Sequence, residues 1–171
     1  MPSKQTMEKA KRDKRRGKSP STQAGEFVRE EMHHIREGKH GARSAKQAIA
    51  IGLSKARRAG VDLRPPEKGK TSEKTRRGAE RAWERGQGAP PKRKPSAKRS
   101  RAIHRALERE GSAAASHQAL SRQAHSAARH RTAAERSAAA KKAVRTKGHA
   151  KLVQAGRKAA KTRAANAKAG G

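Results

Sequence analysis

Lysine and arginine are the most frequent ionisable side chains of this sequence. They occupy 46 of 171 positions against 14 for Asp and Glu, which gives a formal net charge of +32. Three basic runs stand out, at Lys9–Lys18, Lys92–Arg101 and Lys141–Lys168. Cations placed on phosphates release condensed counterions, which makes binding favourable and dependent on salt. The basic runs therefore predict contacts with the phosphate backbone of a nucleic acid.

Aromatic side chains, which stack on the bases of single strands, are almost absent, since Phe27 and Trp83 are the only two. Recognition of unpaired bases needs such platforms. We therefore expect binding that is directed at the backbone and blind to sequence, with double-stranded DNA preferred to RNA. The side chains expected to contact phosphates are Lys11, Arg12, Arg15, Arg16, Arg43, Lys46, Lys55, Arg57, Arg58, Lys92, Arg93, Lys94, Lys98, Arg99, Lys141, Lys142, Arg145, Lys147, Arg157, Lys158, Lys161 and Arg163.

The eight histidines and the acidic residues predict neither a metal site nor a catalytic site. His33 and His34 are adjacent and so point to different faces of a helix, while His40 falls in a loop. The glutamates of the first predicted helix can pair with neighbouring basic side chains as surface ion pairs, and no apolar pocket is expected to shift their pKa. There is no Cys. We expect no enzyme activity, no metal and no cofactor.

Residues 21–63 hold the best apolar pattern and are predicted to fold as a hairpin of two helices. Apolar side chains from Ala24 to Ile35 recur at helical spacing. Gly38 is a natural stop for this first helix, because glycine readily takes the left-handed conformation that ends helices. A short link then makes the second helix antiparallel to the first.

The second predicted helix begins at Ser44, because Ser44 to Gln47 matches a capping box, and Gly60 closes it. Two interpretations of its flanking cations stay open. Its first amides could bind a phosphate, with Arg57 and Arg58 on the backbone beyond. Alternatively, the cations only solubilise the hairpin and favour the carboxyl end of the helix.

Outside the hairpin, low hydrophobicity and high net charge indicate a chain that buries too little apolar surface to offset the entropy of ordering. We expect a mostly α fold with extensive disorder, in which a small helical hairpin and isolated or conditional helices surround no large globular core. The predicted segments are a disordered basic arm (1–20), the hairpin (21–63), a Pro/Gly/Lys-rich linker with a short helix near 72–85 (64–99), a short helix (100–111), and an Ala/Lys/Arg-rich low-complexity tail that is conditionally helical (112–171).

Two stretches, Glu26–Gly41 and Ser44–Gly60, resemble a family of small basic bacterial proteins of unknown function that share a Lys-Gln-Ala-Ile-Ala-Ile-x-Leu-Ser helix motif. Some similar proteins carry the label plasmid stabilisation protein or DNA-binding protein. Gly52 stands where Ala is usual in the family and Lys55 where Glu is usual. The tail is similar in composition to the Lys/Ala-rich tails of linker histones. No residue roles come with either resemblance.

These features together favour an intrinsically disordered, histone-like protein that is associated with a nucleoid or with plasmid maintenance. Such a protein could form a homodimer through the hairpin. In a bacterium its place would be the cytoplasm. No run approaches the roughly 18 apolar residues of a membrane span, so we expect no integral membrane association. Two alternatives stay open: an RNA-binding or ribosome-associated basic protein, and a module that binds a protein or an anionic membrane surface.

Overall fold

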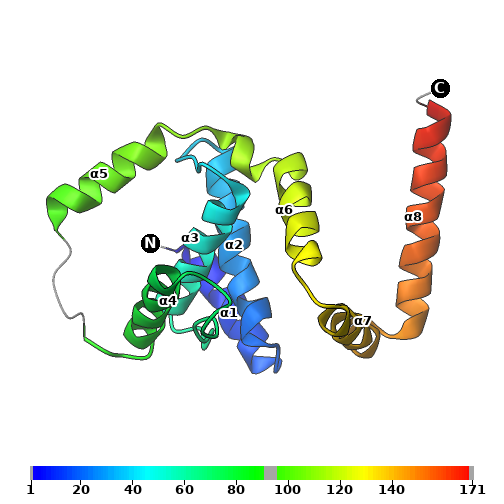
Figure 1. The fold of residues 1–171 in the computed structure, drawn as a ribbon, viewed down its shortest axis with the longest axis horizontal. Coiled ribbons are helices and arrows are strands. Elements are labelled where there is room, and N and C mark those ends of the chain that lie inside the picture. Colours follow the sequence, from blue (N-terminus) through cyan, green and yellow to red (C-terminus); the bar gives the residue numbers. More distant parts are fainter. Residues whose placement is uncertain (1, 91–95, 170–171) are drawn as a thin grey trace. The chain divides into compact units, whose positions relative to one another are not determined.

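The computed structural model describes residues 2–90 and 96–169, of which about three quarters are helical and none lies in a strand. In chain order the helices are α1 (Lys4–Arg15), α2 (Pro20–Arg36), α3 (Ala45–Arg58), α4 (Glu73–Gly86), α5 (Ala97–Glu108), the 3-10 helix η1 (Ser112–Ala115), α6 (His117–Arg129), α7 (Ala133–Lys147) and α8 (His149–Ala169) (Figure 1). The chain divides into two compact units, unit 1 (Met1–Gln123) and unit 2 (Ala124–Gly171).

The prediction of extensive disorder, and with it the description as intrinsically disordered, is wrong. The segment expected to be a disordered basic arm contains α1, which packs against α2. Two later helices, α4 and α5, overlap the short helices expected near 72–85 and at 100–111, and the segment expected to be a conditionally helical tail contains η1 and α6 to α8. The composition misled because most of its apolar residues are Ala, which is the best helix former and needs little space. Helices can then approach closely and bury Ala without large side chains.

The centre of unit 1 is the pair α2 and α3, which lie against each other (Figure 1). Gly38 follows α2 with a φ of 71°, a left-handed conformation that suits glycine. Ser44 caps α3, its hydroxyl accepting a hydrogen bond from the Gln47 amide at 3.2 Å. The Gln47 side chain accepts from the Arg43 amide at 2.9 Å, one residue before the amide that a capping box would use.

Two clusters of buried apolar side chains form the core of unit 1, and α2 contributes to both. Ala supplies most positions in each cluster. The first consists of Met32, Ile35, Ala42, Ala48, Ala114 and Ala115, and the second of Ala10, Ala24, Phe27, Ala56 and Val61. The second cluster explains why α1 is ordered, since Ala10 comes from that helix.

Close backbone approach explains the glycine in the middle of α3. A Cβ at Gly52 would lie 2.7 Å from the Cα of Val28 on α2, nearer than atoms can pack. The two helices therefore cross in contact at this point. Any side chain at position 52, Ala included, would push them apart.

Hydrogen bonds between distant parts of the chain attach the later elements of unit 1 to the hairpin. The Arg36 side chain donates through Nε to the Ala115 carbonyl at 2.9 Å, and the Gly41 amide donates to the Leu107 carbonyl at 2.8 Å. On α4, which packs against α3, Trp83 donates through Nε1 to Asp62 Oδ1 at 2.8 Å. These contacts hold α4 and η1 beside the hairpin.

The described part of unit 2 consists of helices that have no buried side chain. Thr132 and Glu135 form a capping box at the start of α7, and Gly148 ends that helix with a φ of 77°. No described side chain of α7 or α8 is buried, and Val144 and Val153 are among the exposed large apolar residues. Across residues 2–90 and 96–169, no helix is both long and apolar enough to cross a membrane.

Candidate functional site

Most of the cations predicted to contact phosphates lie on the surface. The exposed ones are Lys11, Arg12, Arg15, Arg16, Arg43, Lys46, Arg58, Lys98, Arg99, Lys141, Lys142, Arg145, Lys147, Arg157, Lys158, Lys161 and Arg163. Lys92, Arg93 and Lys94 fall outside the residues that the structure describes. The exposed residues come from both units, on helices and at helix ends.

Two predicted phosphate contacts, Lys55 and Arg57, instead have partners inside unit 1. The Lys55 ammonium donates to the buried carboxylate of Glu31. Arg57 is buried and donates through Nε to the Leu63 carbonyl at 2.9 Å. Burial lowers the pKa of Arg57, although a guanidinium stays charged in proteins. We therefore assign both side chains to the packing of unit 1 and leave them out of the candidate interface.

The cations at the end of α1 are exposed, and one of its two acidic residues, Asp13, is already paired. Asp13 is buried and pairs with Lys18 at 2.9 Å. Arg43, before α3, lies 3.5 Å from the Glu110 carboxylate but keeps 84% of its side chain exposed. Exposed ion pairs of this kind are weak, so a phosphate can compete for Arg43.

Unit 2 offers the densest cationic surface. Residues 124–171 include thirteen Lys and Arg but one acidic residue, Glu135. The cations of α7 and α8 occur on all sides of their helices, and the described ones are exposed. α8 alone has 21 residues, a length of about 30 Å at 1.5 Å per residue. Duplex DNA carries a negative charge about every 1.7 Å of its axis, so such a helix can face many phosphates.

The aromatic residues are not placed for base stacking. Phe27 is 1% exposed, inside the second core cluster. Trp83 is partly buried and hydrogen-bonded to Asp62. These are the two aromatic residues of the chain, so both are committed to the fold of unit 1.

A cavity of about 910 Å³ in unit 1 combines an apolar lining with cations. Arg58 and Arg85 both line it. Partial burial, and secondly the positive charge of Arg85, lower the pKa of Arg58. Two guanidinium groups that repel each other favour an anion between them, because phosphates and carboxylates accept paired hydrogen bonds from arginine.

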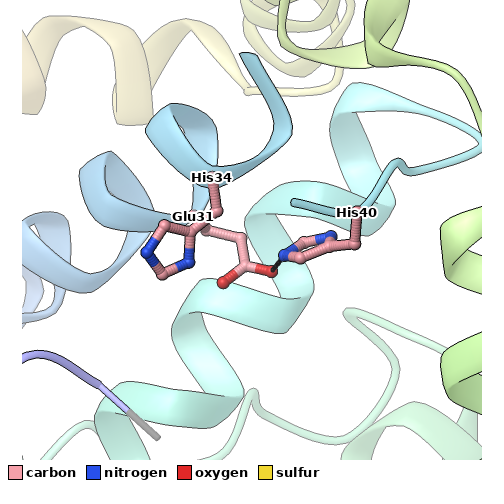
Figure 2. A group of neighbouring side chains, drawn as sticks. All are labelled: Glu31, His34 and His40. Carbon is pink, nitrogen blue, oxygen red and sulfur yellow. Dashed lines mark ion pairs between the residues drawn. The ribbon is translucent and has the colours of Figure 1, made fainter. Parts of the chain in front are cut away.

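The same cavity is bordered by a buried charged cluster. Glu31, on α2, is completely buried, with Lys55 on one carboxylate oxygen and His40 Nε2 3.1 Å from the other, Oε1. Figure 2 shows the carboxylate between the imidazole rings of His40 and His34. Burial, followed by the charge of Lys39, lowers the pKa of His34.

Sequence reasoning did not connect these residues because His40 lies in the loop after α2, and the position of a loop cannot be read from periodicity. One signal was present. Glu31 and His34 are three residues apart and so share a helix face. Gly38 then turns the chain back, which allows His40 to reach that face.

Comparison of the chain with protein-family models, with curated proteins and with solved structures gives no match. The resemblance to small basic bacterial proteins, the plasmid role that it implies and the dimer through the hairpin therefore stay predictions.

Proposed function

We propose that this protein binds duplex nucleic acid, DNA in preference to RNA, through Lys and Arg contacts to the phosphate backbone. The observation that carries the proposal is the cationic surface of unit 2, whose sequence contains thirteen basic residues and one acidic residue. Solubility alone does not need so large an imbalance. Counterion release from the DNA supplies the free energy of such binding.

The proposed interface recognises the shape and the charge of the duplex backbone and does not recognise the base sequence. The helix expected to approach DNA, α3, packs against both α2 and α4, whereas a recognition helix has to enter the major groove. The two aromatic side chains are held inside unit 1. Contacts to phosphates position a protein on DNA but carry no sequence information.

Both units are cationic, which favours bridging. Residues 1–123 contain 33 basic and 13 acidic residues, and residues 124–171 contain thirteen and one. One chain can therefore neutralise phosphates on two duplex segments at once. Such bridging compacts DNA, as expected of a histone-like protein.

The experiment is a titration of several unrelated duplexes with the full chain over a range of salt concentrations. We expect similar affinities for all sequences and a steep fall of log K with log salt. Replacing Lys141, Lys142, Arg145 and Lys147 of α7 by Gln should reduce that slope by up to about 0.9 for each phosphate that is no longer neutralised.

A matched variant keeps the charge of α7 and changes as many side chains. Ala134, Ala138, Ala139 and Ala140 are exposed on the same helix, and their replacement by Gln should leave the slope unchanged. Absent binding, binding insensitive to salt, or an equal loss in the control would contradict the proposal. Competition by structured RNA or by anionic vesicles stronger than by duplex DNA would favour the alternative partners.

A further inference from the structure

We propose that Glu31, His34 and His40 bind a first-row divalent transition-metal ion, with Zn²⁺ as the best match. One carboxylate oxygen and one nitrogen from each imidazole all lie within 4.8 Å of one another. Two imidazoles and a carboxylate are a donor set found in zinc sites and in non-haem iron sites. The proposal is independent of nucleic-acid binding.

The contact between His40 and Glu31 calls for a cation. His40 Nδ1 lies 3.2 Å from the Gly41 carbonyl oxygen, which can only accept, so in the neutral ring Nδ1 carries the proton and Nε2 a lone pair. That Nε2 is 3.1 Å from Glu31 Oε1, which is buried and has no hydrogen-bond partner among the described residues. Two facing lone pairs repel each other unless a proton or a metal ion lies between them.

The spacing suits a metal ion. Bonds of about 2.0–2.1 Å in a tetrahedral zinc site place donor atoms about 3.3 Å apart. The distance of 3.1 Å between His40 and Glu31 is already close to this value. A histidine that binds a metal usually donates its other ring N–H to an acceptor such as a backbone carbonyl, which fixes the orientation and the tautomer of the ring. Nδ1 of His40 has such a carbonyl beside it.

His34 is placed to be the third ligand. It lies on the same face of α2 as Glu31, three residues later. The Glu30 carboxylate lies 4.0 Å from His34 Nε2, where its charge can orient the ring as outer carboxylates do in zinc sites.

Lys55 and the cavity complete the arrangement. Lys55 stays on the second oxygen of Glu31, so the carboxylate would bind the metal through Oε1 alone while a hydrogen bond holds it in place. Glu31 and His40 both border the cavity of unit 1. The cavity gives an ion a way in and leaves a fourth position for water, as in zinc sites with three protein ligands.

The experiment uses the full chain, freed of metal by a chelator, and titrates it with Co²⁺, whose visible absorption reports tetrahedral coordination. We expect one Co²⁺ to bind and Zn²⁺ to displace it. The variants His34→Gln and His40→Gln should each weaken binding at least about tenfold. His33→Gln is the matched control, because His33 is the exposed neighbour of His34 on the same helix, and it should bind as the unchanged protein does.

A second measurement does not depend on the folding of any variant. In the unchanged protein, Zn²⁺ should shift the ring resonances of His34 and His40 and leave those of His33 in place. No stoichiometric binding, equal weakening in the His33 variant, or unaltered binding in the His40 variant would overturn the proposal. A proton on His40 would then be the cation that faces Glu31.

Discussion

Unit 1 buries side chains between several helices, whereas in unit 2 the described side chains are exposed or only partly covered. Both units are rich in Ala, Lys and Arg. Unit 1 differs because a few large residues, with Phe27 and Ile35 fully buried, recur at helical spacing among the alanines. The α7 and α8 helices depend instead on helix propensity and on the capping box at Thr132. A small number of large side chains therefore separates a packed unit from a cationic helical surface.

The substitution Phe27→Ala tests this difference most strongly. Phe27 is almost completely buried in the second core cluster, so its removal should lower the free energy of unfolding of unit 1 by about 3–5 kcal/mol. Urea denaturation followed by the fluorescence of Trp83 measures the change, because the only tryptophan of the chain belongs to α4 in unit 1.

The control for this loss lies in unit 2. Val153, on α8, is 38% exposed, and Val153→Ala should change stability by less than about 0.5 kcal/mol. A large effect there would mean that α8 buries Val153 against something, and the contrast between the units would fail. A small effect of Phe27→Ala would contradict the core as described.

The substitution Lys55→Met tests the buried charges of unit 1. It leaves the Glu31 carboxylate inside the unit without its ammonium partner, and removing one member of a buried pair is costly. We expect a loss of about 3 kcal/mol, measured by urea denaturation in the presence of a chelator. Lys39→Met removes the corresponding partner of Glu37 in an exposed pair and should cost less than about 1 kcal/mol. Equal losses would show that the Glu31 pair behaves as a surface pair.

Local signals in the sequence predicted two features of the pair α2 and α3. The cap at Ser44 and the turn at Gly38 both occur where the pattern places them, because capping and left-handed glycine depend on neighbouring residues alone. The start of α4 at Ser72 follows the same rule. The helical spacing of the apolar residues from Ala24 to Ile35, in turn, indicated the face of α2 that is buried.

Long-range packing could not be predicted in the same way. Nothing in the periodicity of an Ala-rich segment says that Ala115 meets Arg36, 79 residues earlier. The contacts of Lys55 and of His40 with the buried carboxylate of Glu31 depend on such packing too. Net charge could therefore suggest a partner class, but it could not separate surface cations from those that balance a buried carboxylate.

The substitution Gly52→Ala tests whether the backbones of α2 and α3 in unit 1 are in direct contact. The added Cβ would lie 2.7 Å from the Val28 Cα, so strain should exceed the helix-propensity gain of about 1 kcal/mol. We expect a net loss of about 1–2 kcal/mol by urea denaturation. Gly25→Ala on α2, where a Cβ meets nothing within 4 Å, should instead stabilise by up to about 1 kcal/mol. A stabilising Gly52→Ala would mean that α2 and α3 do not touch there.

The smallest effect expected is a pH dependence that belongs to His34 in unit 1. Burial is the main cause that lowers its pKa below the usual 6.5, and the charges of Lys39 and Lys55 add to it, while Glu30 and Glu31 oppose it. Between the two pKa values the unfolded chain binds more protons at His34 than the folded chain does. The stability that His34 contributes is therefore fully present above pH 6.5 and is lost as the pH falls toward the lowered value.

Urea denaturation across this pH range, with a chelator present, should show this loss as the difference between the unchanged protein and His34→Gln. The His33→Gln variant should keep the dependence of the unchanged protein, because His33 is exposed on the same helix. If His34→Gln leaves the pH profile unchanged, the ring is not buried against the cationic side chains of unit 1. The ring would then be exposed, as His149 of unit 2 is, and the contrast in burial between the two units would not extend to this side chain.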